Sequence, residues 1–327
     1  MTYDSNKKIE ELKKKILANP EAASLYDELL WIYFDQESLH NDPGRIDHIL
    51  ECIKRFPREF MCRTPFVNID PKLSPEGFQK VEHEWKRLLD ENPEDHLIAL
   101  GAANFYCSKD VERARDILKI FVEKDSNQAE VWLHLGRYTN NPHERLCCFL
   151  EAQKKGATQP NLLVWIARSA IEASEFQTAE EYAIKLLDLV NNARNEYGDK
   201  LDWNEKGRAL FNKALQDTGD RYNARKLVNE ISAHAYHKHW GHTVLGHVSL
   251  HKGDLQAALS HLRESGEVAG DCRLSSYGPS LTLAKAICVL GEWASVAGYL
   301  KACETFWDDE RLPIWVSMVE SHKMPDF

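Results

Sequence analysis

Apolar residues recur at spacings of three and four positions along almost the whole chain, and strand-like alternation is nearly absent. This periodicity is typical of amphipathic helices that bury one face. Turn-forming Gly, Pro, Asn and Asp residues interrupt it at regular places, among them Asn92-Pro93, Asn141-Pro142 and Gly253-Asp254. The pattern therefore predicts an all-α protein whose helices are roughly 11 to 16 residues long.

One segment, LGHVSLHKGDLQAALSHL, has the features of a helical hairpin. Leu245-Gly246 lies in its first helix, Gly253-Asp254 makes the turn, and Ala258 lies in its second helix, so small residues let the two helices approach closely. These residues resemble the tetratricopeptide repeat, a helix-turn-helix unit of about 34 residues with a Leu-Gly pair and a central Ala. The resemblance implies a right-handed α-solenoid of stacked hairpins.

The same unit can be placed six times along the chain. The best match, AEVWLHLGRY, has Trp132, Leu135 and Gly136 in the register of the family, and a 45-residue step leaves NNARNEYGDKLDWN as an insertion. When the six units are aligned, five of the six residues are small at the eighth place and five of the six at the twentieth place; we call these two places the small-residue columns. The starts are Asp95, Ala129, Pro160, Glu205, His239 and Tyr277, the eighth places are Ala102, Gly136, Ala167, Asn212, Gly246 and Ala284, and the twentieth places are Ala114, Cys148, Ala179, Ala224, Ala258 and Val296.

The ends of the chain fit the repeat less well. A Pro-rich stretch marks a seam near 58–75, where Ser74-Pro75 has the pattern of a helix N-cap with proline at the first helical position. The prediction is N-terminal capping hairpins at 1–75, a repeat array at 76–303, and a closing helix and tail at 304–327. The last 90 residues, about a quarter of the chain, resemble the ends of a group of uncharacterised bacterial repeat proteins through Tyr277-Gly278-Pro279 and Phe306-Trp307.

Composition narrows the function. Apolar residues make up 43% and charged residues 28%, which excludes collagen-like and largely disordered chains. The net charge of −10 argues against a general nucleic-acid binder. The N-terminus has no apolar core of a signal peptide and no long uncharged apolar stretch follows, so a cytoplasmic protein without membrane contact is expected.

The eight cysteines include no C-x-x-C pair and most lie within helical patterns. We expect free thiols that act as small apolar residues, with the adjacent Cys147 and Cys148 as the pair to watch for redox or metal chemistry.

A candidate binding stripe comes from the resemblance, because the ninth place of each repeat lines the concave groove in the tetratricopeptide family. Five of the six residues at that place are basic or can become so: Arg137, Arg168, Lys213, His247 and Lys285, with Ala103 as the sixth. A row of cations would attract an extended anionic ligand, such as an acidic peptide or a C-terminal carboxylate. Neighbouring groove places hold His96, Tyr106, Asn140, Asn161, Trp240 and Thr243. Ordinary surface ion pairs remain the alternative.

Seven of the fourteen histidines fall between positions 234 and 261. His239 with His242, and His247 with His251, have the helical spacing that places two imidazoles on one side of a helix, as a transition-metal site requires. Metal binding, a pH-sensitive contact and ordinary packing all remain open, and no cofactor is predicted.

Motifs of catalysis are missing: the sequence has no Walker loop, no G-x-S-x-G and no Rossmann glycine pattern after a strand. The sequence therefore favours a non-enzymatic scaffold that binds an acidic protein or peptide segment in a groove. A metal-regulated protein and a receptor for a small peptide or small molecule are the alternatives.

Overall fold

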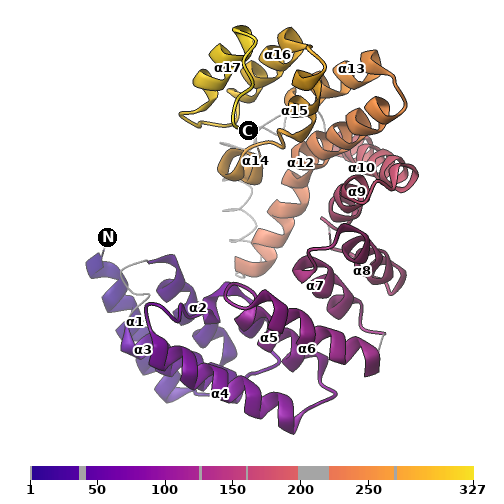
Figure 1. Cartoon of the computed structure of the whole chain (residues 1–327). Helices are drawn as coiled ribbons and strands as arrows, with labels where there is room; N and C mark the ends of the chain where they lie inside the picture. Colours follow the sequence, from indigo (N-terminus) through magenta and orange to yellow (C-terminus); the bar gives the residue numbers. More distant parts are fainter. Residues whose placement is uncertain (1, 37–41, 125–126, 160, 198–220, 269–270) are drawn as a thin grey trace. The chain divides into compact units, whose positions relative to one another are not determined.

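The computed structural model describes residues 2–36, 42–124, 127–159, 161–197, 221–268 and 271–327, and it is shown in Figure 1. Sixteen α-helices and two short 3-10 helices form this part of the chain, and it contains no strand. The all-α prediction is therefore confirmed for these residues. The 3-10 helices are η2 (Phe60–Arg63) and η3 (Pro65–Val67).

The chain forms two compact units, one made of Met1–Asn140 with Glu151–Ala157 and the other of Asn141–Leu150 with Thr158–Phe327. The predicted seam near 58–75 lies within the first unit. The helices of the first unit are α1 (Thr2–Ala18), α2 (Ala23–Asp35), α3 (Pro43–Arg55), α4 (Pro75–Glu91), α5 (His96–Tyr106), α6 (Val111–Lys124) and α7 (Ala129–Tyr138). The division passes through α8 (Pro142–Lys154).

The helices of the second unit pack mainly against their neighbours in sequence, as Figure 1 shows for α9 with α10 and for α12 with α13. They are α9 (Leu162–Glu172), α10 (Phe176–Tyr197), α12 (Arg221–His251), α13 (Leu255–Gly266), α14 (Cys272–Tyr277), α15 (Thr282–Val289), α16 (Trp293–Cys303) and α17 (Leu312–Glu320).

Buried polar contacts hold the irregular segment between α3 and α4 in the first unit. The Arg45 guanidinium, 4% exposed, donates to the carbonyl oxygens of Phe66 at 3.2 Å and Asn68 at 2.7 Å. From α5, the Asn104 amide donates to the Thr64 carbonyl at 2.9 Å. The charged side chain thus satisfies backbone groups that no helix or strand pairs. The predicted start of α4 is confirmed, with Ser74 as N-cap and Pro75 at the first helical position, although the Ser74 hydroxyl does not cap the helix.

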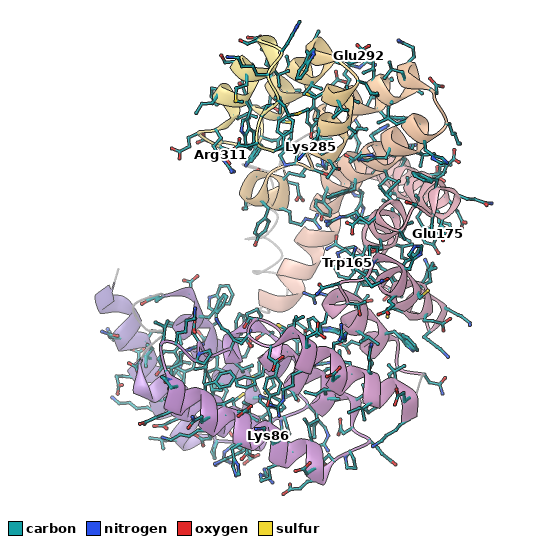
Figure 2. The ribbon with its side chains drawn as sticks, in the orientation of Figure 1. Lys86, Trp165, Glu175, Lys285, Glu292 and Arg311 are labelled. Atoms are coloured by element: carbon teal, nitrogen blue, oxygen red, sulfur yellow. The ribbon has the colours of Figure 1, made fainter. Side chains whose placement is uncertain are left out.

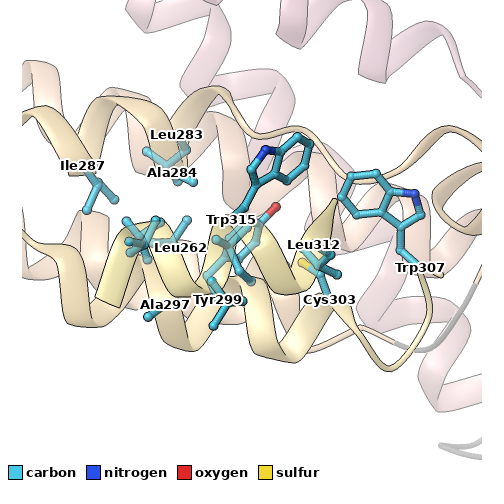
Figure 3. Close-up of a cluster of buried hydrophobic side chains, with 14 of the residues drawn as sticks. Leu262, Leu283, Ala284, Ile287, Ala297, Tyr299, Cys303, Trp307, Leu312 and Trp315 are labelled. Carbon is cyan, nitrogen blue, oxygen red and sulfur yellow. The ribbon is translucent and has the colours of Figure 1, made fainter. Parts of the chain in front are cut away.

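A core of aliphatic and aromatic side chains closes the C-terminal part of the second unit (Figure 3). Leu262 of α13, Leu283 and Ile287 of α15, and Leu300 of α16 are each at most 1% exposed. Trp307 and Trp315 pack with ring centroids 6.0 Å apart, and the Trp315 indole donates to Asp326 at 2.8 Å. This core fixes α15 against α13 and α16.

The residues of the two predicted columns, small except for Asn212 and Val296, are buried wherever the structure describes their side chains. A Cβ on Gly246 would lie 2.2 Å from Leu283 Cδ2, so this glycine is needed for α12 and α15 to approach. Asn212 and the side chain of Ala224 lie outside the described residues. The buried members are Ala102, Gly136, Ala167, Gly246 and Ala284 in the first column, and Ala114, Cys148, Ala179, Ala258 and Val296 in the second.

The predicted helix lengths are wrong for the middle of the chain. Helix α12 runs for 31 residues and α10 for 22, so the predicted hairpin start at His239 lies inside a continuous helix. The reason is local, because no Gly or Pro occurs from Arg221 to Trp240 to stop the helix. Gly241 continues the helix and lies close to Leu187 of α10.

Seven cysteines are free thiols, as the sequence predicts: Cys52, Cys62, Cys107, Cys147, Cys148, Cys288 and Cys303. Cys147 is exposed whereas Cys148 is buried. None of the helices in the described ranges has both the length and the apolar character needed to cross a membrane.

Candidate functional site

The predicted binding residues are divided between the two units. Arg137, Tyr106 and Asn140 belong to the first unit, and Arg168, Trp240, His247 and Lys285 belong to the second. Lys213 lies outside the described residues.

The first-unit residues differ in their exposure. Tyr106 is 2% exposed, and its hydroxyl donates to Glu82 Oε1 at 3.1 Å. Arg137 and Asn140 are exposed. The charges of Arg137 and Arg63 add to burial, the main cause, in lowering the pKa of His134 to about 3.

In the second unit, one face of α12 gathers aromatic and polar side chains. Tyr236, Trp240, Thr243 and His247 follow one another at spacings of four, three and four residues, which places them on one face of the helix. Helix α9 packs against α12, and the Arg168 guanidinium carbon lies 4.2 Å from the centre of the Trp240 ring. Stacking of this kind holds a guanidinium in place while its edge stays available to an acceptor.

Helix α15 extends this face beyond His247. His247 Nε2 lies 3.1 Å from Thr282 Oγ1, and Lys285 is one turn further along α15 on the same side as Thr282. Lys285 is exposed (Figure 2). We call Arg168, Trp240, His247, Thr282 and Lys285 the α12 strip. Because Trp240 and His247 are seven residues apart on one helix, the strip covers at least about 10 Å.

The two permanent charges of the strip are those of Arg168 and Lys285. Burial lowers the pKa of His247, so its imidazole is neutral at pH 7 and takes part as a hydrogen-bonding group. Among the described residues of the second unit, the predicted row of cations thus consists of a guanidinium at one end and an ammonium at the other.

A buried histidine fixes α15 relative to α12. Ser280 N donates to His239 Nε2 at 2.8 Å, so the proton is on Nδ1, which donates to the Ser265 carbonyl at 2.9 Å. The Tyr299 hydroxyl donates to the Ser280 carbonyl at 2.9 Å. Just before, Gly278 has φ +78° and a Cβ there would lie 2.6 Å from Trp307, so only glycine fits this turn. These contacts position Thr282 and Lys285.

Sequence reasoning missed a second stacked arginine beside the first. The Arg273 guanidinium carbon lies 4.0 Å from the centre of the Tyr236 ring. Arg273 donates to both carboxylate oxygens of Asp271, at 2.9 and 3.0 Å, and to Asn161 Oδ1 at 2.7 Å. Asp271 is fully buried. The one sequence signal was the i, i+4 spacing of Tyr236 and Trp240, whose ring centroids are 6.3 Å apart.

The four predicted metal ligands all have other contacts. Both ring nitrogens of His239 are hydrogen-bonded, and burial lowers its pKa to about 4. His242 Nδ1 lies 3.1 Å from His261 Nδ1, and its Nε2 lies 3.3 Å from Glu264. His251 stacks on Phe176 with ring centroids 3.7 Å apart. Within the described ranges, no group of three or more His, Cys, Asp or Glu side chains is placed to hold a metal.

A surface hollow of about 570 Å³ lies in the first unit between α3 and α4. Its lining combines lysines with glutamates, so its charge does not select an anion. The lining residues are Leu50, Lys54, Glu76, Gln79, Lys80, His83 and Glu84.

The comparisons with protein families and with curated proteins found no relative of this chain. No protein-family model matches the chain, and a search of curated proteins gives no match.

Proposed function

We propose that this protein is a non-enzymatic scaffold that binds an acidic segment of a protein or peptide along the α12 strip. The observation that carries the proposal is the stacking of Arg168 on Trp240, with Lys285 further along the same face. In a chain with a net charge of −10, a cation stacked on an aromatic ring and a second, exposed cation on the same strip favour an anionic partner.

The helical pairs support a tetratricopeptide-like arrangement within this proposal. Small residues are buried at the two columns where hairpins of that family contact one another, and Gly246 allows α12 and α15 to approach. We infer a right-handed α-solenoid in which the ninth place of each first helix lines the groove, as the family resemblance implies. The fused helix α12 is a departure from that pattern.

The residues of the strip have distinct chemical roles. The planar guanidinium of Arg168 suits a carboxylate, whereas the ammonium of Lys285 acts as a point charge. The exposed part of Trp240 offers an apolar surface, and Thr282 offers a hydroxyl to a peptide backbone. Since the attraction is between surface charges, affinity should fall as salt concentration rises.

The proposal is tested with a fluorescein-labelled decapeptide of alternating Glu and Ser, and with a Gln-Ser peptide as the neutral counterpart. Wild type is expected to bind the Glu peptide more tightly, by fluorescence anisotropy at two salt concentrations. The double variant Arg168→Glu, Lys285→Glu should raise Kd at least about tenfold and weaken the salt dependence.

A matched control distinguishes a local site from net charge. The variant Arg263→Glu, Lys323→Glu makes the same change in charge at two exposed positions of the second unit. It should leave Kd within about twofold of wild type, because distant surface charges are screened. Equal losses of affinity in the two double variants would contradict the proposal. So would an unchanged affinity in Arg168→Glu, Lys285→Glu. Adding Arg137→Glu separately shows whether the first unit contributes.

A further inference from the structure

The described contacts include six in which a cation stacks on an aromatic ring. In five of these, the cation also forms an ion pair with a carboxylate of the protein. In the sixth, Arg168 on Trp240, no described carboxylate pairs with the guanidinium. The five paired examples are Arg63 with Glu130, Arg113 with Glu82, Lys185 with Glu181, Arg273 with Asp271, and Arg311 with Asp309.

The nearest of the paired examples shows what a complete arrangement looks like. Arg273 stacks on Tyr236 at 4.0 Å and receives the Asp271 carboxylate on two of its nitrogens. Arg168 stacks on Trp240 at 4.2 Å, one turn further along α12. The two arginines therefore stack on rings of the same face of α12, and they differ in whether a described residue supplies the carboxylate.

From this difference we propose that Arg168 binds one carboxylate of the ligand through two N–H groups, as Arg273 binds Asp271. The inference rests on the proposed function and specifies its ligand chemistry. Trp240 is a positioning residue: its ring supports the guanidinium plane, so that less conformational freedom is lost when the carboxylate binds. The carboxylate source is an Asp or Glu side chain or the C-terminus of the bound segment, since both present the same two oxygens.

The variants that test this proposal separate the shape of the cation from its charge. Arg168→Lys keeps the charge and loses the two-pronged geometry, and it should weaken binding of the Glu-Ser peptide at least about fivefold. Lys323→Arg, the reverse exchange at an exposed position outside the strip, should leave affinity within about twofold. Trp240→Leu should weaken binding while Arg168 is still present.

A direct readout comes from the Nε–Hε signal of Arg168 in ¹⁵N-resolved NMR, assigned by its loss in Arg168→Lys. Titration with the Glu-Ser peptide should shift this signal, and the Arg273 signal should move less because its carboxylate is already in place. An amidated Glu-Ser peptide and a Gln-Ser peptide with a free C-terminus show which carboxylate is bound.

The outcomes distinguish the two-pronged Arg168 contact from the proposed scaffold function. If wild type binds neither peptide, both proposals are wrong. If it binds the Glu-Ser peptide, and Arg168→Lys binds equally well with no shift of the Arg168 signal, the scaffold stands and the two-pronged contact is overturned. A phosphoserine peptide that binds more tightly than its Glu equivalent overturns the assignment to a carboxylate. An unchanged circular dichroism spectrum and thermal midpoint in each variant show that the fold is intact.

Discussion

The first and second units each contain an arginine stacked on an aromatic ring, and the two stacks are completed differently. In the first unit, Arg113 lies 4.3 Å from the centre of the Tyr106 ring, and Glu82 accepts from both side chains at 3.1 Å. In the second unit, Arg168 lies at a similar distance from Trp240, with no described carboxylate beside it. Similar ring contacts thus occur with a described internal carboxylate and without one.

The difference indicates how a structural contact is distinguished from a binding contact. A guanidinium that is stacked and paired within the protein has its strongest electrostatic interaction satisfied, so it contributes to the fold. A guanidinium that is stacked but lacks a carboxylate is held in position without that interaction, so a ligand can supply it. Removing the first kind should reduce stability, and removing the second kind should reduce binding.

The largest effect is expected from Asp271, the fully buried carboxylate that completes the Arg273 stack. Asp271→Ala leaves the Arg273 guanidinium, itself 22% exposed, without its anion. Breaking a buried ion pair costs about 3–5 kcal/mol of unfolding free energy. Urea unfolding measures this loss, and a change below about 1 kcal/mol would show that Arg273 is not a structural contact.

Acid should reduce the stability of the protein through the buried residue His239 of α12. Burial lowers the pKa of His239 from 6.5 to about 4, so the folded state favours the neutral ring and the unfolded chain takes up a proton first as pH falls. The stability is fully present above pH 6.5 and is lost between pH 6.5 and 4, by about 3 kcal/mol for this group. Urea unfolding across this range checks the loss.

The control for this pH-dependent loss of stability is His239→Gln. Glutamine keeps an N–H donor and a carbonyl acceptor and does not titrate. It should flatten part of the pH dependence between 6.5 and 4. A pH profile identical to that of wild type would show that other groups cause the loss, among them His242, whose pKa burial also lowers to about 4.

Glu82 should give a smaller effect because its side chain is 20% exposed. Glu82→Ala leaves the hydroxyl of the buried Tyr106 without its acceptor and Arg113 without its anion. We expect a loss of about 2 kcal/mol in stability, with affinity for the acidic peptide unchanged. Peptide binding that weakens in this variant would show that the first unit contributes to recognition.

The sequence predicted the two ends of the α12 strip through repeat register. In the predicted repeat register, Arg168, His247 and Lys285 occupy equivalent places, and Trp240 follows from the same alignment. Their local positions could be predicted because helical periodicity and small residues determine which face is buried. The identity of each contact could not, since it depends on how α9 and α15 pack on α12.

Two sets of contacts could not be predicted from the helical periodicity of the sequence. The Asp271–Arg273 pair meets Tyr236 and Asn161, which are 35 and more positions away in sequence, so no local spacing reveals it. His239 resembled a metal ligand by spacing, yet its two ring nitrogens bind backbone groups from later segments. Long-range packing decides the role of both residues, and periodicity carries no information about it.

The central claim is that Arg168 serves binding and contributes little to the fold, and Arg168→Gln tests it with two readouts on one sample. The variant should lose at most about 1 kcal/mol in unfolding free energy, the value of a partly exposed cation–ring contact. Its Kd for the Glu-Ser peptide should rise at least about tenfold. Unchanged affinity together with a stability loss as large as that of Glu82→Ala would contradict the account, because Arg168 would then be a structural contact like Arg113.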